Sequence, residues 1–231
     1  MLWSKKRQKT LAMEDTYKII IADDHPLFRS ALQQAVQTAV PDAQLLEAEN
    51  VNDLLKLLDL ERDPDLLLLD LKMPGANGFS AFTHLHGQYP ELPIVVISAS
   101  EETSVVQKAK QLGATGFIPK STPLQQLVAA IQHIMEGDDW FPAGIDFTSQ
   151  VEEDPLAERL ASLTPQQYKV LVMLNEGLLN KQIAYELSVS EATIKAHVTA
   201  IFRKLNVKNR TQAVIALQQL ELEPSPEDNE I

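Results

Sequence analysis

A run of four leucines, Leu66–Leu69, that ends on the carboxylate of Asp70 is the feature that most constrains the fold of this chain. A second apolar run, Lys18–Ala22, also ends on acids, Asp23 and Asp24. Such short, near-continuous apolar runs are typical of strands in an open parallel sheet, where the ligand crevice lies outside the carboxyl ends of the strands. Three carboxylates gathered there would repel one another, which favours an oxygen-ligated divalent cation between them.

Short apolar strands alternate with amphipathic helices from position 17 to position 136. The predicted strands are 18–22, 44–48, 65–70, 93–98 and 115–118, and the predicted helices are 26–39, 51–60, 78–88, 102–112 and 123–136. Five strand–helix repeats in about 120 residues predict an α/β doubly wound, five-stranded parallel sheet. From Leu163 onward the pattern predicts helices alone, and therefore a separate all-α domain.

Composition and charge divide the 231 residues further. We predict a basic flexible tail (1–15), a first domain (16–137), an acidic linker (138–157), a second domain (158–221) and an acidic flexible tail (222–231). The second domain is basic, with 8 basic and 5 acidic residues in a chain of net charge −12, which indicates a polyanionic partner for that domain. The absence of cysteine, of a signal sequence and of a long apolar segment predicts a cytoplasmic protein with no membrane partner.

Two further polar residues follow predicted strands at the same sheet edge, Ser98 and Lys120. Asp70 could then attack a phosphoryl group, with Mg²⁺ held by Asp23 and Asp24. Lys120 would pair with the phosphoryl oxygens, and Ser98 would donate a hydrogen bond to one of them. His25, directly before a helix-opening proline, is expected to be a local cap or a surface residue.

The segments IIIADDHPLFRSAL, LLLLDLKMPGANGF, VVISAS and GATGFIPKS resemble the receiver domain of bacterial two-component response regulators, a flavodoxin-like fold. The resemblance implies that Asp70 is the phosphoacceptor, that Ser98 and Lys120 sense the phosphate, and that a sensor histidine kinase is the donor. It also implies that the backbone carbonyl of Lys72 is a further metal ligand and that Phe117 holds the switch position. That position often carries tyrosine, so a switch here would lack a hydroxyl.

The helical region predicts a helix-turn-helix. Thr164 caps a helix, Asn180 is expected to cap the short helix 181–187, and a longer helix spans 191–205 before a last helix at 211–220. The longer helix buries Ile194 and its neighbours at steps of three and four residues, and turns polar residues outward. The residues expected to meet DNA bases or phosphates are Lys181, Thr193, Lys195, Ala196, Thr199, Arg203, Lys204, Lys208 and Arg210.

The segment from LTPQQYKVL to NRTQAV resembles the LuxR-type helix-turn-helix of NarL/FixJ-like regulators. That resemblance implies double-stranded DNA as a partner and makes Lys195, Ala196 and Thr199 the groove-facing positions. Three apolar residues of the last helix either belong to the core or form a two-fold interface in an active homodimer, namely Val214, Leu217 and Leu220.

The sequence therefore predicts a phosphorylation-dependent transcriptional regulator rather than an enzyme. An alternative keeps the fold but uses the first domain as a dimerisation or docking module without phosphorylation. A phosphohydrolase of the haloacid-dehalogenase type would need a second aspartate two residues after Asp70, where this chain has Lys72.

Overall fold

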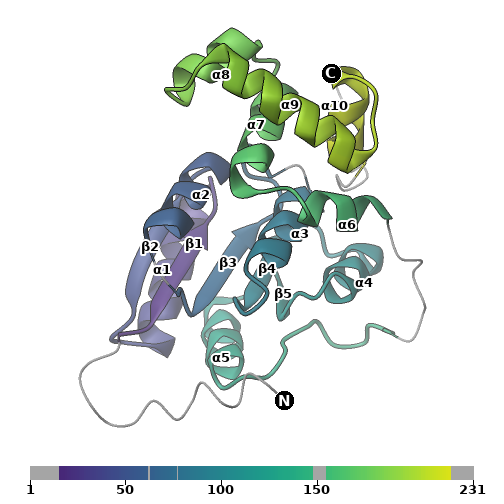
Figure 1. Cartoon of the computed structure of the whole chain (residues 1–231). Coiled ribbons are helices and arrows are strands. Elements are labelled where there is room, and N and C mark those ends of the chain that lie inside the picture. Colours follow the sequence, from purple (N-terminus) through teal and green to yellow (C-terminus); the bar gives the residue numbers. More distant parts are fainter. Residues whose placement is uncertain (1–15, 62, 77, 148–154, 220–231) are drawn as a thin grey trace, which may run out of the picture. The chain divides into compact units, whose positions relative to one another are not determined.

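A computed structural model describes residues 16–61, 63–76, 78–147 and 155–219; the predicted tails and part of the predicted linker lie outside these residues. Five parallel strands form one sheet in the order β2-β1-β3-β4-β5, which confirms the predicted fold class (Figure 1). Their bounds are β1 Lys18–Ala22, β2 Gln44–Ala48, β3 Leu66–Asp70, β4 Ile94–Ser98 and β5 Gly116–Pro119.

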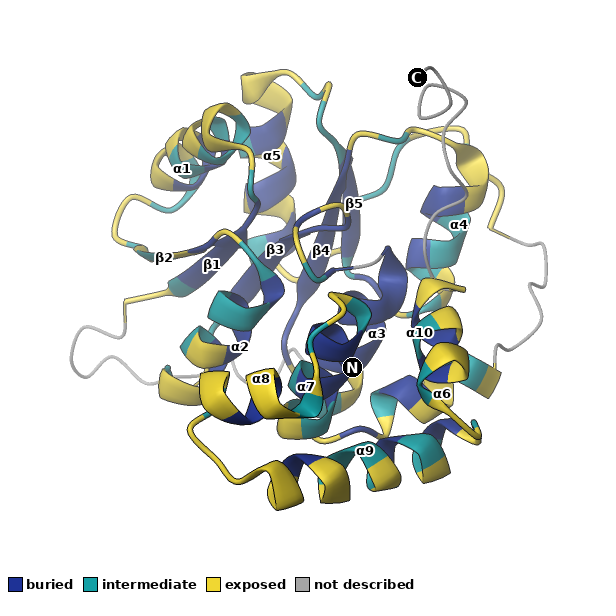
Figure 2. Cartoon of the chain, turned by 90° about the horizontal axis from the view of Figure 1, so that it is seen from above, coloured by how far each residue is buried: buried dark blue, intermediate teal, exposed yellow. Residues whose placement is uncertain are grey.

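The described chain divides into two compact units. The first holds the sheet with α1 (Pro26–Ala39), α2 (Val51–Leu60), α4 (Thr103–Gln111) and α5 (Leu124–Met135). Helices α1 and α5 cover one face of the sheet, and α2 and α4 lie on the other face (Figure 2). Both faces of β3 and β4 are therefore buried, which explains why these strands are continuous apolar runs without alternation.

The strand register brings the acidic residues together. Ala22 of β1 pairs with Leu69 of β3, so the next residue of each strand path, Asp23 and Asp70, falls at the same edge of the sheet. Asp70 pairs with Ile97 of β4, and Ser98 is the residue that follows. The carboxyl ends of three neighbouring strands thus place these polar side chains side by side.

The described residues that follow α5, which were predicted to belong to an acidic linker, pack against the sheet-containing unit. The backbone N–H of Phe117 donates to the carbonyl of Trp140 at 2.8 Å, and the N–H of Trp140 donates to the carbonyl of Thr115 at 3.1 Å. Asp139 forms an ion pair with Lys110 of α4. This segment therefore covers the outer edge of β5, where an exposed strand would offer unpaired backbone groups.

The second unit contains α3 and all the C-terminal helices. Their bounds are α3 Phe79–Gln88, α6 Pro155–Ala161, α7 Pro165–Asn175, α8 Asn180–Glu186, α9 Glu191–Leu205 and α10 Arg210–Gln218. Helix α6 was not predicted, because its first residues fall in the segment interpreted as linker. The predicted cap of α8 is wrong: Asn180 is the first helical residue, and the N-cap position is Leu179, whose backbone N–H donates to Gln182 Oε1 at 2.7 Å.

Helix α3 packs against α6 and α7 through a buried polar contact. The imidazole of His84 stacks on the ring of Tyr168 with centroids 4.1 Å apart, and the hydroxyls of Ser80 and Tyr168 are 3.1 Å apart. A Cβ on Gly87 would lie 2.6 Å from the Cβ of Ala161, so this close approach of α3 and α6 requires glycine. All seven residues from Phe79 to Leu85 are buried.

The buried His84 predicts acid sensitivity of this packing. Burial lowers the pKa of His84 from 6.5 to about 4, and the nearby Leu160 carbonyl offsets this only in part. Because the folded state disfavours the imidazolium, its contribution to stability is complete above pH 6.5 and is lost as the pH falls towards 4. At pH 5 we expect a loss of about 2 kcal/mol.

Thermal unfolding at pH 7.5 and pH 5 measures this loss. The His84→Phe variant keeps a flat ring against Tyr168 but cannot be protonated, so its stability should fall less than that of the wild type over the same interval. Equal losses in the two proteins would contradict the assignment to His84.

Candidate functional site

Three carboxylates and one ammonium meet at the carboxyl ends of β1, β3 and β5. Asp23 and Asp70 are buried, and Asp24 is partly exposed. Lys120 Nζ lies 2.8 Å from Asp23 Oδ2 and 2.8 Å from Asp70 Oδ2. The position of Lys120 is fixed by its backbone N–H, which donates to the carbonyl of Ser98 at 2.7 Å. The predicted cluster of Asp23, Asp24, Asp70 and Lys120 is therefore assembled in the fold.

The electrostatics of the cluster follow from burial and pairing. Burial raises the pKa of Asp70, and hydrogen bonds from the Lys120 side chain and the Lys72 backbone N–H offset this only in part. Burial alone would lower the pKa of Lys120, but its hydrogen bonds to Asp23 and Asp70 outweigh that effect and raise the pKa. Lys120 therefore stays protonated. The carboxylate of Asp70 beside it is more basic, and so more nucleophilic, than a solvated aspartate.

The remaining predicted residues lie around Asp70. Ser98 is fully buried at the end of β4, and its Oγ accepts a hydrogen bond from the N–H of Ser100 at 3.1 Å. The Lys72 side chain is exposed, while its backbone N–H donates to Asp70 Oδ1 at 3.0 Å. Phe117 is fully buried within β5. The sequence placed all three on the correct elements.

His25 is the residue of the cluster that the sequence did not assign to it. Of the two predicted roles, local cap or surface residue, the structure shows the second, since the side chain makes no capping hydrogen bond to α1 and is exposed. Its Nδ1 also lies 2.8 Å from Asp24 Oδ1 and 3.2 Å from Lys120 Nζ. The only signal in the sequence was its position directly after two acids at a strand end.

The donor set suits a hard divalent cation. Ligand atoms of Asp23, Asp24, His25 and Asp70 all lie within 4.8 Å of one another. Carboxylate oxygens are the donors that Mg²⁺ prefers, and two of these three carboxylates are buried, where their mutual repulsion is large. The residues present therefore fit an acidic Mg²⁺ pocket.

A second candidate site is the exposed side of α9. Ile194, Ile201 and Leu205 are buried, and the opposite side of the helix is exposed (Figure 2). Ser190 caps the helix by accepting a hydrogen bond from the N–H of Thr193 at 3.0 Å. Of the predicted DNA contacts, seven have exposed side chains: Lys181, Thr193, Lys195, Ala196, Thr199, Arg203 and Lys208.

The other two predicted DNA contacts, Lys204 and Arg210, donate hydrogen bonds to backbone carbonyls. Arg210 donates to the carbonyls of Leu174 at 2.6 Å and Leu178 at 2.8 Å, which closes the end of α7. Lys204 donates to the carbonyl of Ser162 at 2.7 Å. Both side chains are only partly exposed, so the structure gives them a role in holding the helices together.

Arg210→Met should therefore affect stability more than DNA binding. Methionine keeps much of the apolar stem but removes two charge-assisted hydrogen bonds to carbonyls, at a cost of about 1.5–3 kcal/mol each when the acceptors are left without partners. We expect a clear drop in the Tm of the variant. A variant with unchanged Tm and much weaker DNA binding would show that Arg210 contacts phosphate.

The apolar residues of α10 are not equivalent. Leu217 is fully buried and belongs to the core, whereas Val214 is partly exposed and Ile215, which lies outside the predicted set, is 49% exposed. Leu220 lies outside the described residues. Among the described residues that were predicted for a two-fold interface, only Val214 has an apolar side chain that is partly exposed to solvent.

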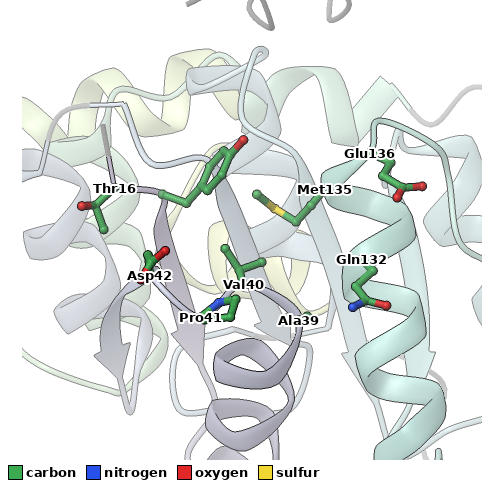
Figure 3. A pocket seen from close by; sticks show the side chains of 9 residues that line it. Thr16, Ala39, Val40, Pro41, Asp42, Gln132, Met135 and Glu136 are labelled. Carbon is green, nitrogen blue, oxygen red and sulfur yellow. The ribbon is translucent and has the colours of Figure 1, made fainter. Parts of the chain in front are cut away.

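A hollow of about 620 Å³ lies at the opposite end of the sheet from the acidic cluster. It is bordered by the segment before β1 at Thr16, the end of α1 at Val40 and the end of α5 at Met135 (Figure 3). Asp42 and Glu136 stand at its rim as exposed residues. Because no buried polar group converges on it among the described residues, this hollow does not compete with the acidic cluster as the functional site.

The sheet order and the acidic cluster define the class of receiver-type signalling proteins. Residues 19–132 match the response regulator receiver domain, and residues 161–217 match the luxR family of bacterial regulatory proteins. The chain is 42% identical to the glycerol metabolism activator of Pseudomonas putida over 208 residues, covering 87% of this chain and 94% of that protein. It is 31% identical to the nitrate/nitrite response regulator NarL of Escherichia coli over 216 residues, covering 90% and 98%.

The chain belongs to the NarL/FixJ-type response regulators, which are DNA-binding transcriptional regulators controlled by phosphorylation and not a class of enzymes. The structure of the Salmonella typhimurium response regulator RcsB has the same fold, with a TM-score of 0.52 and 24% identity over 89% of this chain and 98% of that one. No helix in the described part of the chain is long and apolar enough to span a membrane.

Proposed function

We propose that Asp70 accepts a phosphoryl group from a sensor histidine kinase and that this modification controls DNA binding by α9. The observation that supports it most directly is the buried Asp70 carboxylate, held 2.8 Å from the ammonium of Lys120. An Asp70 oxygen attacks phosphorus, an O–P bond forms, and the bond from phosphorus to the donor breaks. Lys120 then pairs with the new phosphoryl oxygens, and the Ser98 hydroxyl turns from its local bond to donate to one of them.

Mg²⁺ would be held by Asp23, Asp24 and Asp70 together with the backbone carbonyl of Lys72, and when bound it would neutralise charge on the transferring group. Ser98 and Lys120 leave their present partners when the phosphate arrives, and both are anchored at the ends of β4 and β5. Phe117, buried within β5, is the switch position through which that change would reach the surface.

The phosphorylated protein would bind paired DNA half-sites as a homodimer. In support, a solved structure of RcsB contains dimers of that protein on DNA. The proposed contacts are the seven exposed residues of α8, α9 and the following loop, with Lys195, Ala196 and Thr199 in the groove. In this proposal residues 16–137 form the domain that accepts the phosphoryl group, and residues 158–221 form the domain that binds DNA.

DNA-site selection with and without acetyl phosphate tests this function on the full chain. Acetyl phosphate should raise the affinity of the wild type for the selected sites and leave Asp70→Asn unchanged. Asp42→Asn removes an exposed carboxylate at the opposite end of the sheet and should respond like the wild type. If acetyl phosphate changes the affinity of none of the three proteins, the first domain instead serves as a phosphorylation-independent dimerisation or docking module.

A further inference from the structure

Arg29 of α1 ties the loop after β1 to the end of β2. Its Nε lies 2.9 Å from Glu47 Oε2, and its Nη2 lies 2.7 Å from Glu49 Oε1. Its Nη1 donates to the backbone carbonyl of Asp23 at 2.7 Å. The side chain of Arg29 is only 12% exposed, and its planar guanidinium has an acceptor at each of three nitrogens, which fixes its orientation.

Asp23 is held through its backbone as well as through its side chain. The ladder of β1 with β2 ends at the pair Ala22 and Ala48, and Asp23 follows it. The N–H of Asp23 donates to the carbonyl of Ala48 at 3.1 Å, and Asp23 Oδ1 accepts from the N–H of His25 at 2.7 Å. Arg29 adds a hydrogen bond to the carbonyl of Asp23, beyond the last paired residues of the two strands.

The hydrogen bond to the Asp23 carbonyl also orients Asp24. The two residues share one planar peptide group, so a bond to its oxygen fixes the direction in which the chain continues. Asp23, Asp24 and Asp70 offer ligand atoms within 4.8 Å of one another. Carboxylates this close repel one another, and a loose loop would let the first two turn away from Asp70. Arg29 opposes that movement.

Arg29 acts on this loop through geometry and not as a counter-ion. Its charge pairs with Glu47 and Glu49, whereas the atom that it bonds in the loop is a neutral carbonyl oxygen. Lys120, by contrast, pairs directly with a carboxylate of the cluster, since its Nζ lies 2.8 Å from Asp70 Oδ2. Another cation in place of the guanidinium should therefore not preserve the effect of Arg29.

We propose that Arg29 is a positioning residue of the acidic cluster. By holding the peptide group between Asp23 and Asp24, it keeps both carboxylates turned towards Asp70 at the spacing that a shared divalent cation requires. The inference rests on the metal pocket of the proposed function. A residue that only tied α1 to β2 would add to stability but would leave the affinity for the cation unchanged.

The test measures cation affinity and stability separately in the full-length protein. Mn²⁺ is the probe, because the EPR signal of free Mn²⁺ gives its Kd, and the Kd of Mg²⁺ follows by competition. Arg29→Met keeps much of the apolar stem but cannot hold the carbonyl, and it should bind both ions about tenfold more weakly, as is typical when a residue that orients a ligand is removed. Labelling by acetyl phosphate should slow by a similar factor at limiting Mg²⁺ and approach the wild-type rate at saturating Mg²⁺.

Two further variants separate geometry from charge. Arg29→Lys keeps the charge but has no planar fork, so it should bind Mn²⁺ at least about fivefold more weakly than the wild type, and it carries the test if Arg29→Met does not fold. Lys18→Met removes a lysine at the opposite end of β1 that pairs with Glu61 at 2.8 Å. Its Mn²⁺ affinity should stay within about twofold of the wild type, because solvent screens a charge over the length of the strand.

Asp24→Asn is the reference for the loss of a ligand and should abolish tight Mn²⁺ binding; if it does not, the metal pocket of the proposed function is wrong. If Asp24→Asn loses binding while either Arg29 variant binds Mn²⁺ as tightly as the wild type, the pocket stands and Arg29 only stabilises the fold. An equal loss in Lys18→Met would also overturn the proposal, because the affinity would then follow net charge.

Discussion

Asp70→Asn should abolish labelling of this protein by acetyl phosphate in the presence of Mg²⁺. The substitution keeps the shape of the side chain but replaces the nucleophilic oxygen pair by an amide, which cannot form the acyl phosphate. No other described carboxylate combines burial at a strand end with a bond to Lys120 except Asp23, which is directed at the same ammonium. Labelling is measured by the mass increase of the intact protein.

A folding defect would not account for the loss of labelling. Burial raises the pKa of Asp70, which means that the folded state disfavours its charge, so a neutral Asn should leave the Tm equal to or above that of the wild type. Asp42→Asn should be labelled as fully as the wild type. A label retained on Asp70→Asn would remove Asp70 from the role of phosphoacceptor.

The double substitution Lys195→Ala with Arg203→Ala should weaken binding to a selected DNA site by at least about 30-fold, because each contact to a base or phosphate contributes about 1–3 kcal/mol. Both side chains are exposed on α9, and the ion-pair partner of Lys195 is the exposed Glu191, at 3.0 Å. Breaking that pair to meet DNA costs little, since solvent already screens it. The slope of log K against log salt should fall by up to about 1.8.

The control is Lys56→Ala, which removes an exposed lysine of α2 that pairs with Asp53. It changes the net charge but belongs to the sheet-containing unit and not to α9, so the DNA affinity should stay within about twofold of the wild type. If Lys56→Ala and the double variant weaken binding equally per charge removed, DNA binding depends on net charge rather than on the face of α9.

Local sequence signals predicted β1, β2, α1, α2 and α9 to the residue and most other elements to within one residue at either end. Pro26 begins α1 as predicted, and the helices 26–39, 51–60 and 191–205 end where predicted. These signals work because a capping side chain, a first-turn proline and an apolar stripe act within a few residues of one another. The apolar strands ending on acids, read together with the resemblance, also identified the cluster around Asp70.

Other features depend on contacts between distant parts of the chain. Trp140 follows the edge of β5, where it pairs with backbone groups of Thr115 and Phe117 that the sheet itself leaves without partners, and no local sequence pattern predicts this pairing. Arg210 was interpreted as a phosphate contact, but the carbonyls that it holds belong to residues more than thirty positions away. A basic residue looks the same in sequence whether its partner is DNA or the end of a helix.

The sequence by itself determined that an α/β domain is followed by an all-α domain, and which side of α9 is polar. It also determined the strand ends that carry the polar site residues, namely Asp23, Asp24, Asp70, Ser98 and Lys120. Each of these features is specified by periodicity and by the residue type at the end of an element. Only the tertiary structure decided which charges are paired, that α3 buries His84 against Tyr168, and that the exposed imidazole of His25 lies against the carboxylate of Asp24. Pairing and burial are properties of neighbours in space, and the strand register that creates those neighbours forms only when the sheet assembles.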